Sequence, residues 1–183
     1  YRKNISIGVA RAGNVIGGGD WSKDRLIPDC IRAWSKGNKA IVRNPQSTRP
    51  WQHVLEAIWG YIFFASKLNF NKKLNGQAFN FGPNIKKNYR VTDLINTIEK
   101  YWPNIKYSTS AKKTKKFHES SLLKLNCNKA KKLLKWKSIL SFNETGRLTA
   151  KWYKDFYKNK ENIRETSLKQ IKKYDELFKR SVR

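Results

Sequence analysis

The chain has 183 residues, of which 39% are hydrophobic and 13% aromatic, and this excludes a disordered polypeptide and fits one ordinary domain. Its 40 basic and 13 acidic residues give a net charge of +27, but the basic residues run from end to end without a nucleic-acid recognition motif. We therefore expect no nucleic-acid partner, and the short apolar stretches exclude a bilayer-spanning helix and a membrane partner.

The first part of the chain predicts a strand, a loop, a helix and a second strand. An apolar run over 5–10 is typical of a buried strand in a parallel sheet, and the glycines between 13 and 19 predict a loop after it. The helix that follows has Pro28 in its first turn and ends at Gly37. Residues 40–43 predict another short strand.

The middle of the chain continues this alternation. Residues 54–68 are apolar nearly all round, which predicts a helix packed on a sheet. A turn at Gly76 precedes a strand over 77–81. Thr92 is expected to cap a helix that ends at Tyr101.

The last part of the chain is predicted to be mainly helical. Residues 122–126 predict a strand and 128–134 a short helix. Ser141, followed three residues later by Glu144, is a capping box that opens a long helix. The final helix, 166–180, is basic and has a narrow apolar face, so we expect it to lie at the periphery in solvent. The apolar residues of this face are Leu168, Ile171, Leu177 and Phe178.

The alternation of strands and helices predicts an α/β domain with a mostly parallel sheet. In open sheets of this class, ligands bind beyond the carboxyl ends of the strands. We therefore expect the functional residues in the loops after Ala10, Arg43 and Phe81.

The two cysteines, Cys30 and Cys127, lie far apart and form no paired motif. They indicate neither a disulfide framework nor a metal site. This usage predicts a protein of the reducing cytoplasm.

Three polar motifs fall in or near the expected loops. The glycine-rich segment RAGNVIGGGDW, residues 11–21, lets the backbone approach a ligand, and its Asn14 offers an amide that donates and accepts. Arg25 precedes a helix start, where anions bind. Arg43 and Arg49 flank a turn, and one pyrophosphate would satisfy both guanidinium groups. Each motif alone is also typical of an ordinary turn or surface.

Together these motifs resemble those of the extended short-chain dehydrogenase/reductases that act on nucleotide sugars. The resemblance extends through FNFGPN, residues 79–84, to Trp152-Tyr153 and covers essentially the whole chain. Within that family, AGNVIGGGDW, DRLIPD, STRPWQHVLE and HES with LLKLNC are similar to the CDP-glucose 4,6-dehydratases. The resemblance implies the C-terminal part of an extended Rossmann-type dehydrogenase, with parallel strands, helices and a small mixed substrate-binding subdomain.

The resemblance also implies how the chain divides and what it lacks. Residues 1–70 would complete the Rossmann core and carry substrate loops, 71–160 would form mainly the substrate-binding subdomain, and 161–183 the basic C-terminal helix. The catalytic Tyr-x-x-x-Lys motif and the glycine fingerprint of the family are absent. We therefore expect a C-terminal half that is continued upstream, contains no catalytic residue and does not turn over substrate alone.

The resemblance implies binding roles for individual residues. Asn14 would hydrogen-bond the pyrophosphate of a nucleotide sugar, and Arg49 would clamp the diphosphate. Ala12 and Gly13 would pass close to the nicotinamide of NAD, which would be bound mainly by the missing half. The remaining contacts to the nucleotide would come from Arg25, Leu26, Arg43, Asn80, His118 and Glu119.

The implied reaction is an NAD-assisted loss of water from CDP-glucose. Hydride passes from C4 of the sugar to NAD, water is lost across C5 and C6, and the hydride returns to C6. The 4-keto-6-deoxy product would serve deoxysugar and surface polysaccharide synthesis, and we expect a homo-oligomer when full length. A related epimerase is the close alternative. A basic nucleic-acid-binding module and a non-catalytic interaction module are alternatives from other classes.

Overall fold

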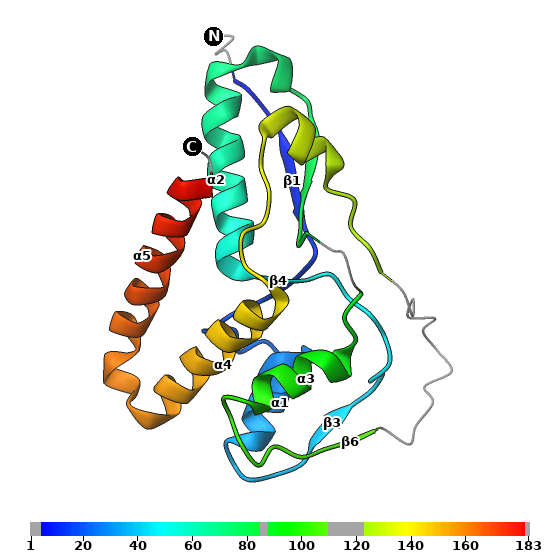
Figure 1. The fold of residues 1–183 in the computed structure, drawn as a ribbon, viewed down its shortest axis with the longest axis vertical. Helices are drawn as coiled ribbons and strands as arrows, with labels where there is room; N and C mark the ends of the chain where they lie inside the picture. The colour runs from blue at the N-terminus through cyan, green and yellow to red at the C-terminus, as the bar shows by residue number, and fades with distance from the viewer. Residues whose placement is uncertain (1–4, 85–87, 110–122, 182–183) are drawn as a thin grey trace.

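The computed structural model describes residues 5–84, 88–109 and 123–181, and Figure 1 shows two regions joined by helix α4. The strands are β1 (Val9–Ala12), β2 (Asn14–Ile16), β3 (Ala40–Val42), β4 (Trp51–His53), β5 (Ala78–Phe81) and β6 (Tyr107–Thr109). The helices are α1 (Leu26–Trp34), α2 (Val54–Phe70), α3 (Val91–Glu99), α4 (Phe142–Lys158) and α5 (Ile163–Ser181). Short helical turns are η1 (Lys72–Leu74), η2 (Ala130–Leu134) and η3 (Lys160–Asn162).

The strands pair in parallel, which confirms the predicted α/β class. Strand β1 pairs with β5, β2 with β4, and β3 with β6. In each pair the partners are distant in sequence, so that Val9 lies opposite Ala78 and Ala40 opposite Tyr107. Among the described residues these are three separate two-stranded pairs rather than one continuous sheet.

The lower region of Figure 1 has its own hydrophobic core, which we call the α1–α3 core. Ile27 of α1 and Leu94 of α3 are buried in it, and the indole nitrogen of Trp34 donates to the carbonyl oxygen of Lys106 at 2.9 Å. The core consists of Ile16, Ile27, Cys30, Ile31, Trp34, Ala40, Val42, Trp51, Val91, Leu94, Ile95, Ile98, Ala150 and Tyr153.

The upper region has a second core, the β1–β5 core, which lies between β5, α2, η2 and α5. Phe81 of β5 contacts Trp136, with ring centroids 5.0 Å apart, and Phe79 contacts Phe64 of α2 at 4.8 Å. The core consists of Leu55, Phe64, Leu74, Phe79, Phe81, Ala130, Leu134, Trp136, Leu140, Leu148, Tyr174 and Phe178.

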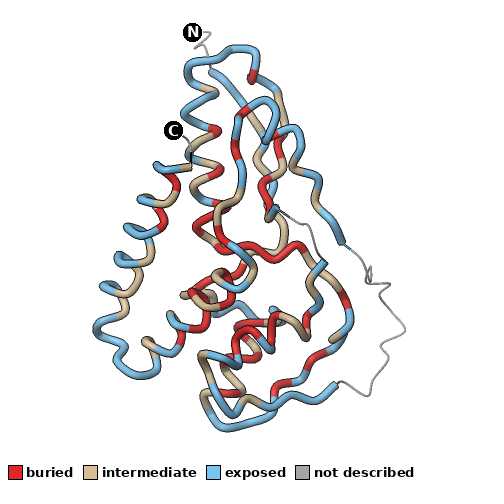
Figure 2. Tube along the Cα trace, in the orientation of Figure 1, coloured by how far each residue is buried: buried red, intermediate tan, exposed pale blue. Residues whose placement is uncertain are grey.

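The first strand differs from its prediction in both bounds and burial. Strand β1 begins at Val9, and the side chains of Ile5, Ile7 and Val9 are 68%, 65% and 50% exposed. Figure 2 shows this N-terminal segment largely in the colour of exposed residues. The prediction of a buried strand is wrong here because, within the described part of the chain, only β5 pairs with β1.

Two further local predictions are wrong. Helix α3 begins after Arg90 rather than at Thr92, because the carboxylate of Asp93 accepts the backbone N–H of Arg90 at 2.7 Å. Residues 123–126 form no strand, and the carbonyl oxygen of Asn126 accepts a side-chain amide instead of a strand partner.

Most helix predictions are confirmed, with one change at the C-terminus. Ser141 and Glu144 form the predicted capping box of α4, with the Ser141 hydroxyl 3.2 Å from the Glu144 nitrogen. Helix α5 is present but is not wholly peripheral, because Tyr174 and Phe178 are buried in the β1–β5 core. Leu168 on the predicted apolar face is half exposed. No helix within the described ranges is long and apolar enough to cross a membrane.

Candidate functional site

The connection between β1 and β2 brings two predicted binding segments together. A Cβ on Gly13 would lie 2.9 Å from Cγ and 3.0 Å from the carbonyl oxygen of Pro50, so only glycine allows this approach. Asn14 opens β2 and lies opposite Trp51 in the parallel register. The segment that carries Ala12, Gly13 and Asn14 is thus packed against the segment that carries Arg49.

The rest of the glycine-rich loop is held by an aromatic face of α4. A Cβ on Gly18 would lie only 2.0 Å from the indole ring of Trp152. The hydroxyl of Tyr153 donates to the carbonyl oxygen of Asp20 at 2.6 Å, and burial raises the pKa of this hydroxyl. The ring of Trp21 packs against Tyr153 with centroids 5.3 Å apart. These contacts fix the loop before it reaches α1.

Arg25 is tied into this loop. One guanidinium nitrogen forms an ion pair of 2.9 Å with Asp20, and the other donates to the carbonyl oxygen of Val15 at 2.7 Å. Leu26 begins α1 and packs against the α1–α3 core. Both residues lie at the N-terminus of a helix, where an anion is stabilised.

Arg43 and Arg49 have different surroundings. Arg43 lies 3.8 Å from the carboxylate of Asp24 and donates to the carbonyl oxygen of the same residue at 3.3 Å. Arg49 donates from its guanidinium to the carbonyl oxygen of Thr48 at 2.9 Å, and its backbone N–H donates to Tyr89.

A cavity of about 250 Å³ lies beside Arg49, and we call it the Arg49 cavity. Its wall includes β4, the start of α2, the loop after β5, the segment 138–141 that precedes α4 and the first turn of α4. The lining residues are Arg49, Trp51, Gln52, Glu56, Pro83, Asn84, Tyr89, Ser138, Leu140, Ser141, Phe142 and Thr145.

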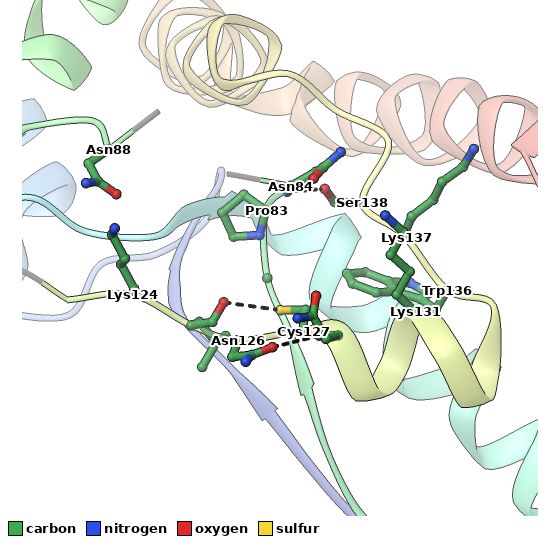
Figure 3. Close-up of a pocket in the computed structure, with 13 residues that line it drawn as sticks. Pro83, Asn84, Asn88, Lys124, Asn126, Cys127, Lys131, Trp136, Lys137 and Ser138 are labelled. Carbon is green, nitrogen blue, oxygen red and sulfur yellow. Dashed lines mark hydrogen bonds between the residues drawn. The ribbon is translucent and has the colours of Figure 1, made fainter. Parts of the chain in front are cut away.

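A larger cavity of about 400 Å³, the Asn126 cavity, adjoins it and shares Pro83, Asn84 and Ser138 (Figure 3). Its described lining is basic, since it includes Lys124, Lys131 and Lys137, and none of the described lining residues is acidic. These cations and the neighbouring amide groups suit an anionic or hydroxylated ligand group.

The side chain of Asn80 belongs to the frame of the Asn126 cavity. Its amide donates to the carbonyl oxygen of Asn126 at 3.0 Å, across 46 residues of sequence. Asn80 lies opposite Arg11 in the strand register, one step before Ala12. Cys127 lines the same cavity, and burial raises the pKa of its thiol.

Most of the predicted site residues are therefore linked by contacts between their segments, and two of them lie outside the described residues. Ala12, Gly13 and Asn14 lie against the Arg49 segment, Arg25 is linked to them through Val15, and Arg43 is linked to the Arg25 loop through Asp24. His118 and Glu119 lie outside the described residues. The sequence prediction missed Asn84, Ser138 and Gln52 as lining residues, although Asn84 ends the FNFGPN segment that supports the resemblance.

Comparison with known proteins shows which enzymes this chain is similar to. The chain is 37% identical to the CDP-glucose 4,6-dehydratase of Salmonella typhimurium over 159 residues, which cover 87% of the chain and 44% of the enzyme. No protein-family model matches the chain. The sequence resemblance to the CDP-glucose 4,6-dehydratases is confirmed.

Solved structures agree on the fold. The UDP-glucuronic acid 4-epimerase of Bacillus cereus, in complex with UDP-glucuronic acid and NAD, matches with a TM-score of 0.69 at 19% identity, covering 84% of this chain and 46% of that one. The dTDP-glucose 4,6-dehydratase of Bacillus anthracis, in complex with NAD, gives 0.63 at 21% identity, covering 84% and 45%. The chain has the fold of the C-terminal part of a Rossmann-type epimerase or dehydratase. It spans about half the length of the relatives it matches.

Proposed function

We propose that this chain is the C-terminal, nucleotide-sugar-binding portion of a CDP-glucose 4,6-dehydratase. The observation that carries the proposal is the 37% identity to that enzyme over 87% of the chain. The geometry supports it, because the segments that carry Asn14 and Arg49 pack together just beyond the carboxyl end of β1, where open parallel sheets bind ligands. The full-length protein would act in the cytoplasm, in deoxysugar and surface polysaccharide synthesis.

Arg49 is the principal substrate contact in this proposal. Its planar guanidinium offers parallel donors that match a diphosphate, and the adjoining cavity offers a partly enclosed place for the anion. Asn14 adds an amide from the neighbouring segment. The nucleotide is bordered by Arg25, Leu26, Arg43, Asn80, His118 and Glu119.

NAD would supply the hydride-transfer chemistry of such an enzyme. The residues present fit a minor contribution to NAD binding, because Ala12 ends β1 with only a methyl group, so a ligand can approach the backbone there. Gly13 follows it, and its Cβ side is packed against Pro50. The chain contains no glycine fingerprint for the cofactor phosphates. The other half of the polypeptide would bind those phosphates and provide the catalytic Tyr and Lys.

The division of labour follows from this proposal. Residues 1–70 complete the Rossmann core, 71–160 contribute mainly to substrate binding, and 161–183 form the C-terminal helix. The chain alone would bind the nucleotide but would not turn over the substrate. The full-length protein would be a homo-oligomer.

Calorimetric titration of CDP into the full-length protein tests the role of Arg49. We expect Arg49→Ala to weaken binding by roughly 2 to 5 kcal/mol, because a charged hydrogen-bonding partner is lost, and Arg49→Lys to fall between. Arg164→Ala, on the exposed side of α5, is the matched control. An Arg49→Ala affinity within about threefold of the parent would contradict the diphosphate assignment.

A related 4-epimerase is a second candidate, because the Bacillus cereus epimerase shares the fold of this chain, with a TM-score of 0.69. Incubation of the full-length protein with CDP-glucose and with UDP-glucose separates the two. A 4-keto-6-deoxy product from CDP-glucose supports the dehydratase, and a C4 epimer without loss of water supports the epimerase. DNA binding that disappears with added salt, without any effect of CDP, would favour the nucleic-acid alternative instead.

A further inference from the structure

Glu56 is a buried carboxylate that the proposed function leaves unused. It lies in the first turn of α2, and only 1% of the residue is exposed. Among the described residues it forms no ion pair with a Lys, Arg or His. A buried charge without hydrogen-bonding partners is strongly unfavourable, so the donors around this carboxylate must account for its presence.

Three donors from two distant segments converge on Glu56. One carboxylate oxygen accepts the backbone N–H groups of Ile139 and Leu140 at 2.7 and 2.5 Å. The other accepts the hydroxyl of Tyr174 on α5 at 3.0 Å. These partners lie 83, 84 and 118 residues away in sequence. A single side chain therefore joins α2, α5 and the segment that precedes α4.

The segment that Glu56 holds forms a wall of both cavities. Leu140 lines the Arg49 cavity, and Ser138 lines that cavity and the Asn126 cavity. The Ser138 hydroxyl accepts the backbone N–H of Asn84 at 2.7 Å, which ties the same segment to the loop after β5. Figure 3 shows Ser138 and Asn84 facing each other at the edge of the Asn126 cavity.

We infer that Glu56 is a positioning residue: together with Tyr174 it holds residues 138–141 in place and so shapes the cavity beside Arg49. The identity of the ligand rests on the proposed function, whereas the positioning rests on the contacts themselves. The inference also assigns a structural role to the basic C-terminal helix, because Tyr174 on α5 supplies the hydroxyl that donates the third hydrogen bond to Glu56.

Tyr174 is well placed to hold this carboxylate. Its ring packs edge-on against Trp59 with centroids 5.3 Å apart, and only 1% of the residue is exposed. Burial and the neighbouring carboxylate raise the pKa of the Tyr174 hydroxyl, so it remains a hydrogen-bond donor. The carboxylate is thus contacted by one fixed side chain and two backbone groups.

Amide hydrogen exchange and CDP titration on the full-length protein test this inference together. Tyr174→Phe removes the hydrogen bond to the Glu56 carboxylate and should speed exchange of the Ile139 and Leu140 amides by about threefold to tenfold. Glu56→Ala should speed this exchange more, because it removes the acceptor of both amides. Both variants should weaken CDP binding by at least about threefold. Glu56→Gln keeps an acceptor oxygen and should restore most of both properties.

Matched variants separate positioning from binding and from general loss of stability. Tyr157→Phe, on α4 and 45% exposed, and Glu165→Gln on the surface of α5 should change neither measurement. Arg49→Ala should weaken CDP binding without faster exchange at Ile139 and Leu140.

Three outcomes decide the inference. It is wrong if Tyr174→Phe and a folded Glu56→Ala both leave exchange at Ile139 and Leu140 within about twofold of the parent. It is also wrong if these two variants exchange the Ile139 and Leu140 amides faster but bind CDP as tightly as the parent, while Arg49→Ala does weaken CDP binding. If the parent protein fails to bind CDP, the proposed function is wrong, and the exchange data alone decide whether Glu56 positions the segment.

Discussion

The two regions of the molecule close their cores to different degrees. In the α1–α3 region, the inward side chains of β3, Ala40 and Val42, are buried beneath helices, and only Ile41 between them is exposed. In the β1–β5 region, large apolar side chains remain exposed on β1, on the residues just before it and on α2. These side chains are Ile5, Ile7, Val9, Ile58, Ile62 and Phe70.

This difference indicates which strands the chain covers with its own helices and which it leaves exposed. Parallel strands are normally covered on both faces, and an isolated pair of strands is marginally stable. In the α1–α3 core, helices α1, α3 and α4 cover the inward face of β3, although Ile41 on its other face is 70% exposed. Strand β1 also has one partner strand among the described residues, and the apolar side chains on it and just before it are exposed. We propose that the rest of a longer polypeptide covers β1, in keeping with the 44% share of the matched dehydratase that this chain spans.

Ile7→Lys should give the largest effect, and it should be harmful in the full-length protein but favourable for the solubility of the isolated chain. In the full-length protein the new charge would be buried without a partner, and we expect a loss of roughly 3 to 5 kcal/mol in the free energy of unfolding. In the isolated chain the same change should reduce self-association with little cost, because Ile7 is exposed there. Denaturant unfolding and sedimentation measure the two effects. Equal, small effects in both proteins would show that β1 is not covered.

Gly18→Ala tests how firmly α4 holds the glycine-rich loop beside the α1–α3 core. The new methyl group would meet Trp152 at 2.0 Å, and we expect a loss of about 1 to 3 kcal/mol from overpacking. In a Trp152→Ala background the same change should cost well under about 1 kcal/mol, because the obstructing ring is gone. Equal costs in the two backgrounds, measured by denaturant unfolding, would show that the ring does not restrict the loop.

Comparing Glu56→Gln with the parent should show how the stability of the β1–β5 region depends on pH. Burial raises the pKa of Glu56 above its ordinary value, although the hydrogen bonds from Leu140, Ile139 and Tyr174 oppose the shift. A raised folded-state pKa contributes stability below the ordinary pKa and loses it as pH rises through the folded value. The Gln variant should therefore become more stable relative to the parent as pH rises through the folded-state pKa of Glu56, measured by thermal unfolding. A gain by the parent instead would mean that the hydrogen bonds outweigh burial.

Gly37→Ala and Gly76→Ala should each give a modest effect and test whether the two regions unfold together. Both glycines have left-handed backbone, with φ of 70° and 74°, and neither Cβ would meet another atom within 4 Å. Each change should cost about 1 to 2 kcal/mol of backbone strain. Gly37 lies just after the end of α1, and Gly76 precedes β5. Equal shifts of a single calorimetric transition would therefore indicate one cooperative unit. Two transitions, each shifted by one variant only, would show independent regions.

The sequence determined the features that depend on near neighbours. The stop at Gly37 and the capping box of Ser141 and Glu144 are local, because backbone conformation and hydrogen bonds three residues apart decide them. The motif order also sufficed for the fold. The cap at Thr92 failed because Asp93, one residue further on, satisfies the backbone of Arg90.

Only the tertiary structure decided which side chains are buried and what they contact. Glu56 is an ordinary acidic residue in a helical first turn by sequence, and its burial depends on donors 83 to 118 residues away. Tyr174 was missed for the same reason, while Ile7 was expected to be buried and is exposed because a strand needs neighbours that its own sequence cannot supply. Periodicity reports which residues share a face, but burial is set by whatever packs on that face.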